Sequence, residues 1–121
     1  MPIKNILVVD DSPTDRQHLT DILSKSGYNV STAASAEEGI AKVKQTRPDL
    51  VLMDVVLPGH NGYQATRELS KDEATKDIPV ILCTSKSQET DRVWGMRQGA
   101  RDYIVKPVNA DELIAKIHAF D

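Results

Sequence analysis

The chain has 121 residues, of which 40% are hydrophobic and 27% are charged, and its formal net charge at pH 7 is −3. A chain of this length can bury one hydrophobic core but not two, so we expect one domain over residues 1–121 that holds the whole function, without an output domain. Acidic and basic residues are mixed along the chain, which argues against nucleic-acid binding. The apolar runs are too short for membrane insertion, and the single cysteine, Cys83, excludes an internal disulfide. We therefore expect a cytoplasmic protein.

Five short segments have the composition of β-strands. Four of them are nearly continuous apolar runs rich in β-branched residues, which is typical of buried strands in a parallel sheet. The remaining segment alternates polar and apolar residues. In chain order, the predicted strands are Ile6–Val9, the alternating Tyr28–Thr32, Val51–Met53, Val80–Cys83 and Tyr103–Val105.

The stretches between these strands have helical periodicity and recognisable ends. Ser12 followed by Pro13 predicts the start of the first helix, and Gly27 predicts that the helix has ended. Ser35 with Glu38 three residues later has the pattern of a capping box, which predicts the start of the second helix. Three more helices are predicted: one over residues 62–72, one that follows Ser87 and ends near Gly99, and one after the candidate cap Asn109.

Alternation of five strands with five helices requires parallel neighbours joined by right-handed crossovers. The sequence therefore predicts an α/β fold, in which a doubly wound five-stranded parallel sheet has helices on both faces. In such a sheet, ligands bind outside the carboxyl ends of the strands, at the point where the strand order reverses. Functional residues are therefore expected at this edge of the sheet.

Polar residues follow the apolar strands at this edge. Asp10 and Asp11 come after the first strand, and Asp54 comes after the third; Thr84 and Lys106 come after the fourth and fifth. If the strand order is 2-1-3-4-5, the first and third strands are neighbours and the three carboxylates converge. A divalent cation would relieve their mutual repulsion at neutral pH, and a set of oxygen ligands suits Mg²⁺, with Mn²⁺ possible.

A carboxylate beside such a cation can be a ligand only, or it can be the nucleophile that becomes an aspartyl-phosphate. Phosphoryl transfer needs neutralisation of the charge on the transferred group and in-line access for the attacking atom. The metal, the Lys106 ammonium and the Thr84 hydroxyl can supply the neutralisation. A loop containing Pro and Gly follows Asp54, and we expect this loop to leave Asp54 accessible.

Several motifs at this edge carry a family resemblance: Asp10-Asp11, Asp54 followed by Leu57-Pro58 and Asn61-Gly62, Thr84-Ser85, and Tyr103 followed by Lys106-Pro107. Along essentially its whole length, the chain resembles the receivers of two-component response regulators of the chemotaxis CheY type. The resemblance implies the CheY-like, flavodoxin-like fold with strand order 2-1-3-4-5.

The resemblance also implies roles for the acidic residues. Asp54 would be the phosphoacceptor. Asp11, Asp54 and the backbone carbonyl of Val56 would bind Mg²⁺, and Asp10 would hold a metal-bound water. Because such a protein promotes only its own phosphorylation and dephosphorylation, it would not be an enzyme that turns over a separate substrate.

The remaining implied roles concern phosphate contact and switching. Lys106 and Thr84 would contact the phosphoryl group, and Thr84 would move toward it so that Tyr103 can turn inward. The face formed by the fourth helix, fifth strand and fifth helix would then change shape and bind a downstream protein target. The phosphodonor would be a histidine kinase, the Lys106–Pro107 bond would be cis, and we expect a monomer.

A narrower resemblance concerns three segments, residues 62–67, 88–95 and 97–103. These segments are similar to the stand-alone PilH-type regulators of twitching motility. The similarity implies a histidine kinase of a pilus chemosensory array as donor, and an output that acts on type IV pilus extension or retraction.

The same residues bear on other functions that this fold class can have. A flavodoxin-type carrier of FMN would need a phosphate-binding loop after the first strand, where Asp10 and Asp11 would repel phosphate. A hydrolase of the haloacid-dehalogenase kind would need an acid two residues after Asp54, where this chain has Val56. An interaction module that keeps the receiver fold but acts independently of phosphorylation stays open as an alternative.

Overall fold

The computed structural model describes residues 2–57, 59, 61–86 and 88–121, so the predictions that fall on Pro58 and Ser87 lie outside the described residues. Strands and helices alternate as the periodicity predicted. The strands are β1 (Asn5–Val9), β2 (Asn29–Ala33), β3 (Leu50–Met53), β4 (Val80–Thr84) and β5 (Asp102–Val105). The helices are α1 (Pro13–Lys25), α2 (Ala36–Thr46), α3 (Gly62–Lys71), α4 (Glu89–Arg97) and α5 (Ala110–His118).

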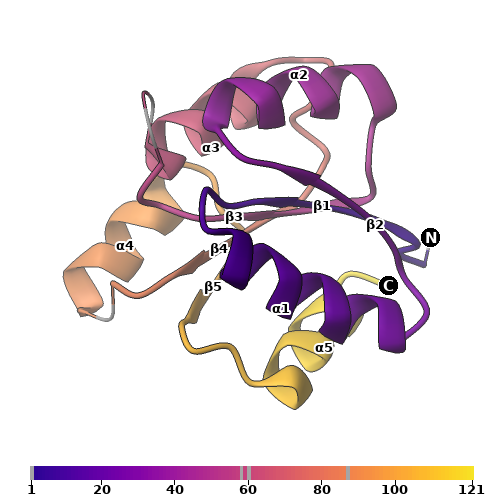
Figure 1. Cartoon of the computed structure of the whole chain (residues 1–121). Coiled ribbons are helices and arrows are strands. Elements are labelled where there is room, and N and C mark those ends of the chain that lie inside the picture. Colours follow the sequence, from indigo (N-terminus) through magenta and orange to yellow (C-terminus); the bar gives the residue numbers. More distant parts are fainter. Residues whose placement is uncertain (1, 58, 60, 87) are drawn as a thin grey trace.

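The strands form one parallel sheet in the order β2-β1-β3-β4-β5, which confirms the predicted doubly wound fold (Figure 1). Because β1 lies between β2 and β3, Val9 is the register partner of Met53. The N–H of Asp54 also donates to the carbonyl of Val9, at 2.9 Å. The residues that follow β1 and β3 are therefore side by side at the carboxyl edge of the sheet.

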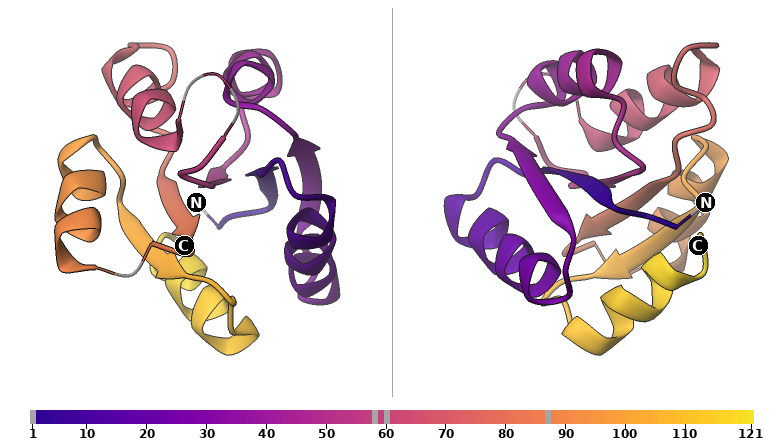
Figure 2. Two further views of the ribbon diagram at one scale, coloured as in Figure 1. Left: turned by 60° about the vertical axis from the view of Figure 1, so that its left-hand side comes forward. Right: turned by 90° about the vertical axis from the view of Figure 1, so that its right-hand side faces the viewer.

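Helices cover both faces of the sheet (Figure 2). On one face, Leu23 of α1 and Leu113 of α5 pack in a cluster of fully buried side chains. On the other face, Val43 of α2 and Leu69 of α3 pack in a second cluster, which also contains Tyr103 of β5. Full burial of such a side chain contributes about 1.5–3 kcal/mol, so the two clusters fix the strands between them. None of the described helices is long and apolar enough to cross a membrane.

The predicted capping box at the start of α2 forms only in part. The side-chain oxygen of Ser35 accepts from the N–H of Glu38 at 3.2 Å, but the Glu38 carboxylate accepts from the N–H of Ala34 instead of that of Ser35. A complete capping box is present at α3, where Asn61 and Gln64 each accept a hydrogen bond from the other's backbone N–H. This box fixes the start of α3 beside the candidate site.

The start of α3 lies against the backbone of Asp54. The N–H of Gly62 donates to the carbonyl of Val55 at 2.7 Å. A Cβ atom at position 62 would lie 1.9 Å from the carbonyl oxygen of Asp54, far inside van der Waals contact. Only glycine therefore allows α3 to begin this close to the strand end that carries Asp54.

We predict that Gly62→Ala lowers the free energy of unfolding by about 3 kcal/mol or more, because backbone must move to relieve the clash. Urea unfolding followed by circular dichroism measures the change. Gly27→Ala is the matched control, since it adds the same methyl group at a residue with φ of +93° and open space around it; we expect a loss of about 1 kcal/mol there. Equal losses in the two variants would contradict the prediction.

Candidate functional site

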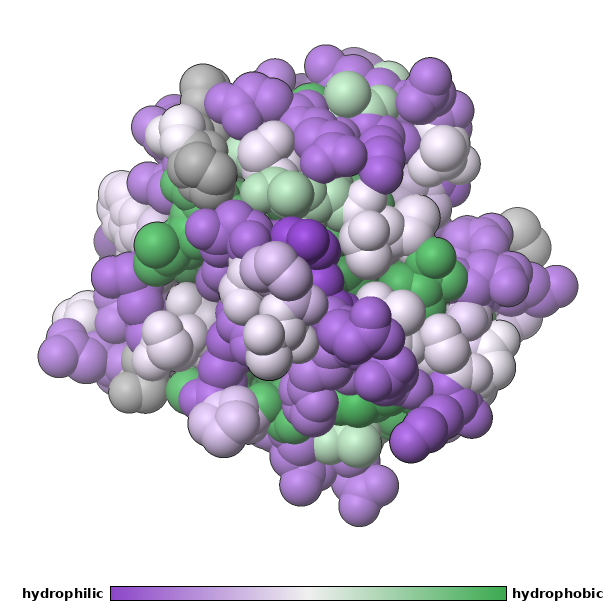
Figure 3. All heavy atoms as spheres, in the orientation of Figure 1, coloured by the Kyte–Doolittle hydropathy of each residue, from purple (hydrophilic) through white to green (hydrophobic). Residues whose placement is uncertain are grey.

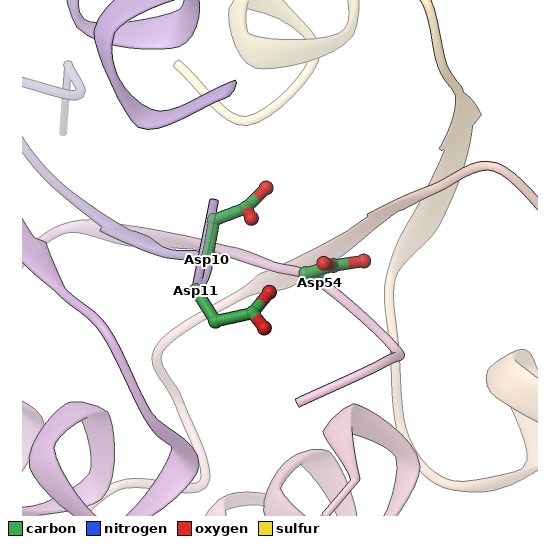
Figure 4. Close-up of side chains that lie close together, drawn as sticks. All are labelled: Asp10, Asp11 and Asp54. Carbon is green, nitrogen blue, oxygen red and sulfur yellow. The ribbon is translucent and has the colours of Figure 1, made fainter. Parts of the chain in front are cut away.

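Three carboxylates meet at the carboxyl edge of the sheet. Asp10 and Asp11 follow β1, Asp54 follows β3, and Figure 4 shows their side chains extending toward a common space. Each of the three contributes an oxygen atom, and these atoms all lie within 4.8 Å of one another. Asp10 is 1% exposed and Asp54 is 7% exposed, whereas Asp11 is exposed. The predicted convergence of these three residues is therefore present in the fold.

Asp10 has a hydrogen-bond partner for each of its carboxylate oxygens. Oδ1 accepts from the backbone N–H of Ser12 at 2.9 Å, and Oδ2 accepts from Lys106 Nζ at 2.6 Å. The guanidinium of Arg16 donates to the backbone carbonyl of Asp10 at 2.8 Å. Because a buried charge is costly unless it is paired and hydrogen-bonded, these contacts explain how Asp10 can be almost wholly buried.

Lys106 is the cation that the acidic residues share. Its Nζ lies 2.6 Å from Asp10, 2.9 Å from Asp15 and 3.5 Å from Asp54, measured to the nearest carboxylate oxygen. Burial alone would lower the pKa of Lys106, but the hydrogen bonds with Asp10 and Asp15 and the charge of Asp54 outweigh burial and raise it. The Lys106–Pro107 peptide bond is cis, as the family resemblance implied.

The surroundings of the Asp54 carboxyl group change its pKa. Burial, followed by the negative charge of Asp10, raises the pKa of Asp54 from 3.8 to about 6. The ammonium of Lys106 and the backbone N–H groups of Val55 and Val56 oppose this rise. Asp54 thus loses its proton just below neutral pH, and it then places an ionised oxygen in a partly desolvated cleft.

Thr84 and Tyr103 are connected through the backbone of one residue, Lys86. Thr84 is the last residue of β4, not the residue after it as predicted, and its hydroxyl accepts from the N–H of Lys86 at 3.3 Å. Tyr103 is 5% exposed, and its hydroxyl donates to the carbonyl of Lys86 at 2.7 Å. The ring therefore occupies an inward position, and the backbone of Lys86 connects it with the edge of the sheet.

Asp11, Asp54 and Lys106 line an open cleft of about 450 Å³, together with residues for which the sequence indicated no role in the site. Asp15 is the most important of these, because it contacts Lys106 directly. Its position four residues after Asp11, in the first turn of α1, is the sequence signal that could have indicated it. The lining residues are Asp11, Ser12, Asp15, Asp54, Val56, Ser85, Lys106 and Pro107.

The donor set of the cleft suits a hard divalent cation. Carboxylate oxygens are the ligands that Mg²⁺ and Mn²⁺ prefer, and the three that converge here could share one such ion. Val56 follows Asp54 by two residues and lines the same cleft. The cluster therefore fits the magnesium ion expected from the sequence.

A doubly wound α/β sheet with an acidic cleft and a lysine at its carboxyl edge is the architecture of a receiver. Residues 6–118 match the response regulator receiver domain, and the chain belongs to this family. The family resemblance drawn from the sequence is thereby confirmed. Receivers of this family serve two-component systems, in which a histidine kinase is the phosphodonor.

Two relatives show how the chain compares with a protein of similar length and with a longer one. It is 55% identical to Protein PilH of Pseudomonas aeruginosa over 114 residues, which cover 94% of each chain. It is 39% identical to the phosphate regulon transcriptional regulatory protein PhoB of the same organism, where the match covers 96% of this chain and 51% of PhoB. The chain thus spans about half the length of PhoB and nearly all of PilH.

Solved structures agree with the fold. A CheY-like response regulator receiver domain protein from Methanospirillum hungatei has a TM-score of 0.88 and 33% identity, covering 97% of this chain and 92% of the other. The receiver domain of a sensor histidine kinase from Pseudomonas aeruginosa has a TM-score of 0.89 and 31% identity, covering 97% and 96%. That second structure has a magnesium ion coordinated in its active site cleft.

The pKa of Asp54 leads to a prediction for stability without metal. Because the folded state raises this pKa from 3.8 to about 6, it binds more protons than the unfolded state between these values, and its stability falls as the pH rises through them. The full cost, at most about 3 kcal/mol, applies above pH 6. We expect Asp54→Asn to be more stable than the original chain at pH 7.5 with EDTA and nearly equal at pH 4.

Urea unfolding at the two pH values measures this difference. Asp77→Asn, which removes an exposed carboxylate that does not line the cleft, is the control for a change of one charge. A stabilisation by Asp54→Asn of the same size at pH 4 and pH 7.5 would contradict the predicted link to ionisation.

Proposed function

We propose that this protein is a phosphorylation-activated signalling switch, in which Asp54 accepts a phosphoryl group from a histidine kinase. The observation that carries the proposal is the grouping of Asp54 with two further carboxylates and the Lys106 ammonium in one cleft of a receiver fold. The grouping provides a nucleophile, a cation site and a fixed positive charge for the transferred group. Phosphoryl transfer depends mainly on such positioning and charge neutralisation.

The residues that would hold Mg²⁺ are Asp11, Asp54 and the carbonyl of Val56, with Asp10 holding a water of the ion. When bound, the ion neutralises charge on the phosphoryl oxygens. Two observations support this assignment. One carboxylate oxygen of each of the three acids lies within 4.8 Å of the others, and the related receiver domain from Pseudomonas aeruginosa has a magnesium ion in its active site cleft. The acidic residues also attract a cation, because the single positive charge of Lys106 does not balance their combined negative charge.

In the proposed transfer, an Asp54 carboxylate oxygen forms a bond to phosphorus while the bond between phosphorus and the kinase histidine nitrogen breaks. The imidazole nitrogen keeps the electron pair of that bond. Lys106 donates a hydrogen bond to one phosphoryl oxygen, and Thr84 donates from its hydroxyl to another. Lys106 needs only a small movement for this role, because its Nζ already lies 3.5 Å from Asp54.

The proposed switch passes from the cleft to α4. A movement of the Thr84 hydroxyl toward the phosphoryl group alters its contact with the N–H of Lys86, whose carbonyl accepts from Tyr103. The Tyr103 ring and the Tyr63 ring both lie close to Gly95 of α4. A phosphoryl group would therefore bias which packing of α4 is favoured, as a population shift between two arrangements.

The proposed output face consists of α4, β5 and α5. Val93, Trp94 and Met96 of α4 are exposed, as is Val105 of β5, with Trp94 at 52%. In Figure 3, hydrophobic atoms are visible as separate patches in a mostly hydrophilic surface. A half-exposed tryptophan is the type of residue that anchors a protein interface. We therefore assign the downstream protein target to this face.

The biological setting that we propose is chemotaxis-like control of type IV pilus twitching motility. The support is the similarity to PilH-type regulators, with 55% identity to Protein PilH over nearly the whole of both chains. The kinase would then belong to a pilus chemosensory array. A deletion strain assayed for the size of its twitching zones would test this setting. Restoring the gene as Asp54→Asn would then test whether the role depends on the phosphoacceptor.

We predict that incubation with acetyl phosphate and Mg²⁺ adds one phosphoryl group to the protein, because a small phosphodonor can reach Asp54 through the open cleft. Intact mass spectrometry measures the added mass. Asp54→Asn should show none, and EDTA should reduce the addition at least about tenfold. Asp77→Asn, an exposed acid, serves as the matched control and should be phosphorylated like the original chain.

The same measurement separates the switch from the alternative of a phosphorylation-independent interaction module. A folded protein that gains no phosphoryl mass from acetyl phosphate, and none from a cognate kinase, would support the module. Phosphorylation at a residue other than Asp54 would contradict the assigned acceptor while leaving the family intact.

We predict that beryllofluoride with Mg²⁺, which imitates the phosphorylated aspartate, increases binding of the downstream target, and that Trp94→Ala removes this increase. Loss of a buried interface tryptophan costs about 2 kcal/mol or more, or about thirtyfold in affinity. A pulldown from the native cell, with and without beryllofluoride, measures the binding. Val30→Ala on β2, at the opposite edge of the sheet, is the control and should bind normally.

A further inference from the structure

Asp15 is a fourth carboxylate in the cleft, and its direct partner is Lys106. It lies in the first turn of α1, where its N–H donates to the Ser12 side chain and its carboxylate accepts from Lys106 Nζ at 2.9 Å. The Asp15 side chain is 43% exposed, whereas that of Lys106 is 15% exposed. The acid thus reaches from the edge of the cleft to a lysine that is mostly enclosed.

The three distances around Lys106 show where its ammonium is held. Nζ is within hydrogen-bonding distance of Asp10, at 2.6 Å, and of Asp15, at 2.9 Å, but it is 3.5 Å from Asp54. An ammonium has three N–H donors, and two of them are used by these shorter bonds. Asp10 is buried, and among the described residues its carboxylate forms an ion pair with Lys106, whereas Asp15 is partly exposed, so Asp15 is the partner that Lys106 can release at lower cost.

We propose that Asp15 is a positioning residue, which holds the Lys106 ammonium on the α1 side of the cleft and so competes with the phosphoryl group for it. This inference rests on the proposed function, because it concerns the contact between Lys106 and a phosphoryl oxygen. When an anion occupies the space beside Asp54, Lys106 must weaken its bond to Asp15 to reach it. Asp15 therefore lowers the affinity of the site for phosphoryl-like anions.

A simpler effect of Asp15 must be separated from this one. Any negative charge near the cleft repels an anionic donor, with or without a bond to Lys106. The two effects differ in their dependence on Lys106, because competition for the ammonium disappears when the ammonium is removed, whereas repulsion does not. A double-mutant cycle distinguishes them.

The test uses Asp15→Asn, with Asp15→Glu as the conservative variant and Asp21→Asn as the matched control. Asp21 is an exposed acid on the same helix, and its hydrogen-bond partner is Gln17. The substitution Asp21→Asn therefore removes one negative charge from α1 without changing a contact of Lys106. The affinity for beryllofluoride in Mg²⁺ is measured by fluorine NMR. The rate of phosphorylation is measured against acetyl phosphate concentration, which gives KM and the maximal rate separately.

We expect Asp15→Asn to bind beryllofluoride about two- to fivefold more tightly and to lower KM for acetyl phosphate by the same factor, as fits a partly exposed ion pair. The maximal rate should change less than about twofold. Asp15→Glu and Asp21→Asn should resemble the original chain. With Lys106→Met in place, the additional change Asp15→Asn should leave the beryllofluoride affinity unchanged.

Several outcomes would overturn the inference: an Asp15→Asn affinity equal to or weaker than the original, a gain that persists with Lys106→Met, or an Asp15→Glu variant that behaves as Asp15→Asn. A second readout needs no anion. The Lys106 ammonium should give a slowly exchanging proton–nitrogen NMR signal in the original chain and a weaker one in Asp15→Asn. If the original chain neither binds beryllofluoride nor accepts phosphate, the proposed function fails instead, and the NMR signal still tests the positioning.

Discussion

The acidic cleft depends on the burial of like charges at the carboxyl edge of the parallel sheet. Asp10 and Asp54 are almost fully enclosed, and Lys106 is the cation that contacts both. One ammonium cannot neutralise them together with Asp11 and Asp15, so the cleft keeps an excess of negative charge that favours a divalent cation. The apolar strands behind these residues make the excess possible, because burial of the strands stabilises the fold that brings the carboxylates to one edge.

Much of this could be predicted from the sequence, because the signals are local. Apolar strands rich in β-branched residues gave the sheet, and the polar residue after each strand gave Asp10, Asp54 and Lys106. The alternation of elements favoured parallel neighbours, and the order β2-β1-β3-β4-β5 then brings distant acids together. The strands and their common edge follow from the period of the strands and the rule that parallel strands end at the same edge, whereas the strand order itself was implied by the family resemblance.

The parts that the sequence did not indicate depend on side-chain direction. A motif at Ser35 and Glu38 predicts reciprocal bonds, but the Glu38 carboxylate turns to the N–H of Ala34, one residue earlier. Asp15 stands in the first turn of α1, where acids are common for their interaction with the helix dipole, so its residue type alone does not indicate a role in the site. Its contact with Lys106 spans 91 residues of sequence, and neither composition nor periodicity reports a pairing at that distance.

The contacts of Lys86 are made by its main chain. Its N–H donates to Thr84 and its carbonyl accepts from Tyr103, while its own side chain is exposed. The chemical identity of residue 86 is therefore free to vary without loss of either bond, with proline as the exception because it has no N–H. Evolution or a protein engineer can thus adjust the charge beside the cleft, or attach a reporter group there, while the communication between cleft and tyrosine stays intact.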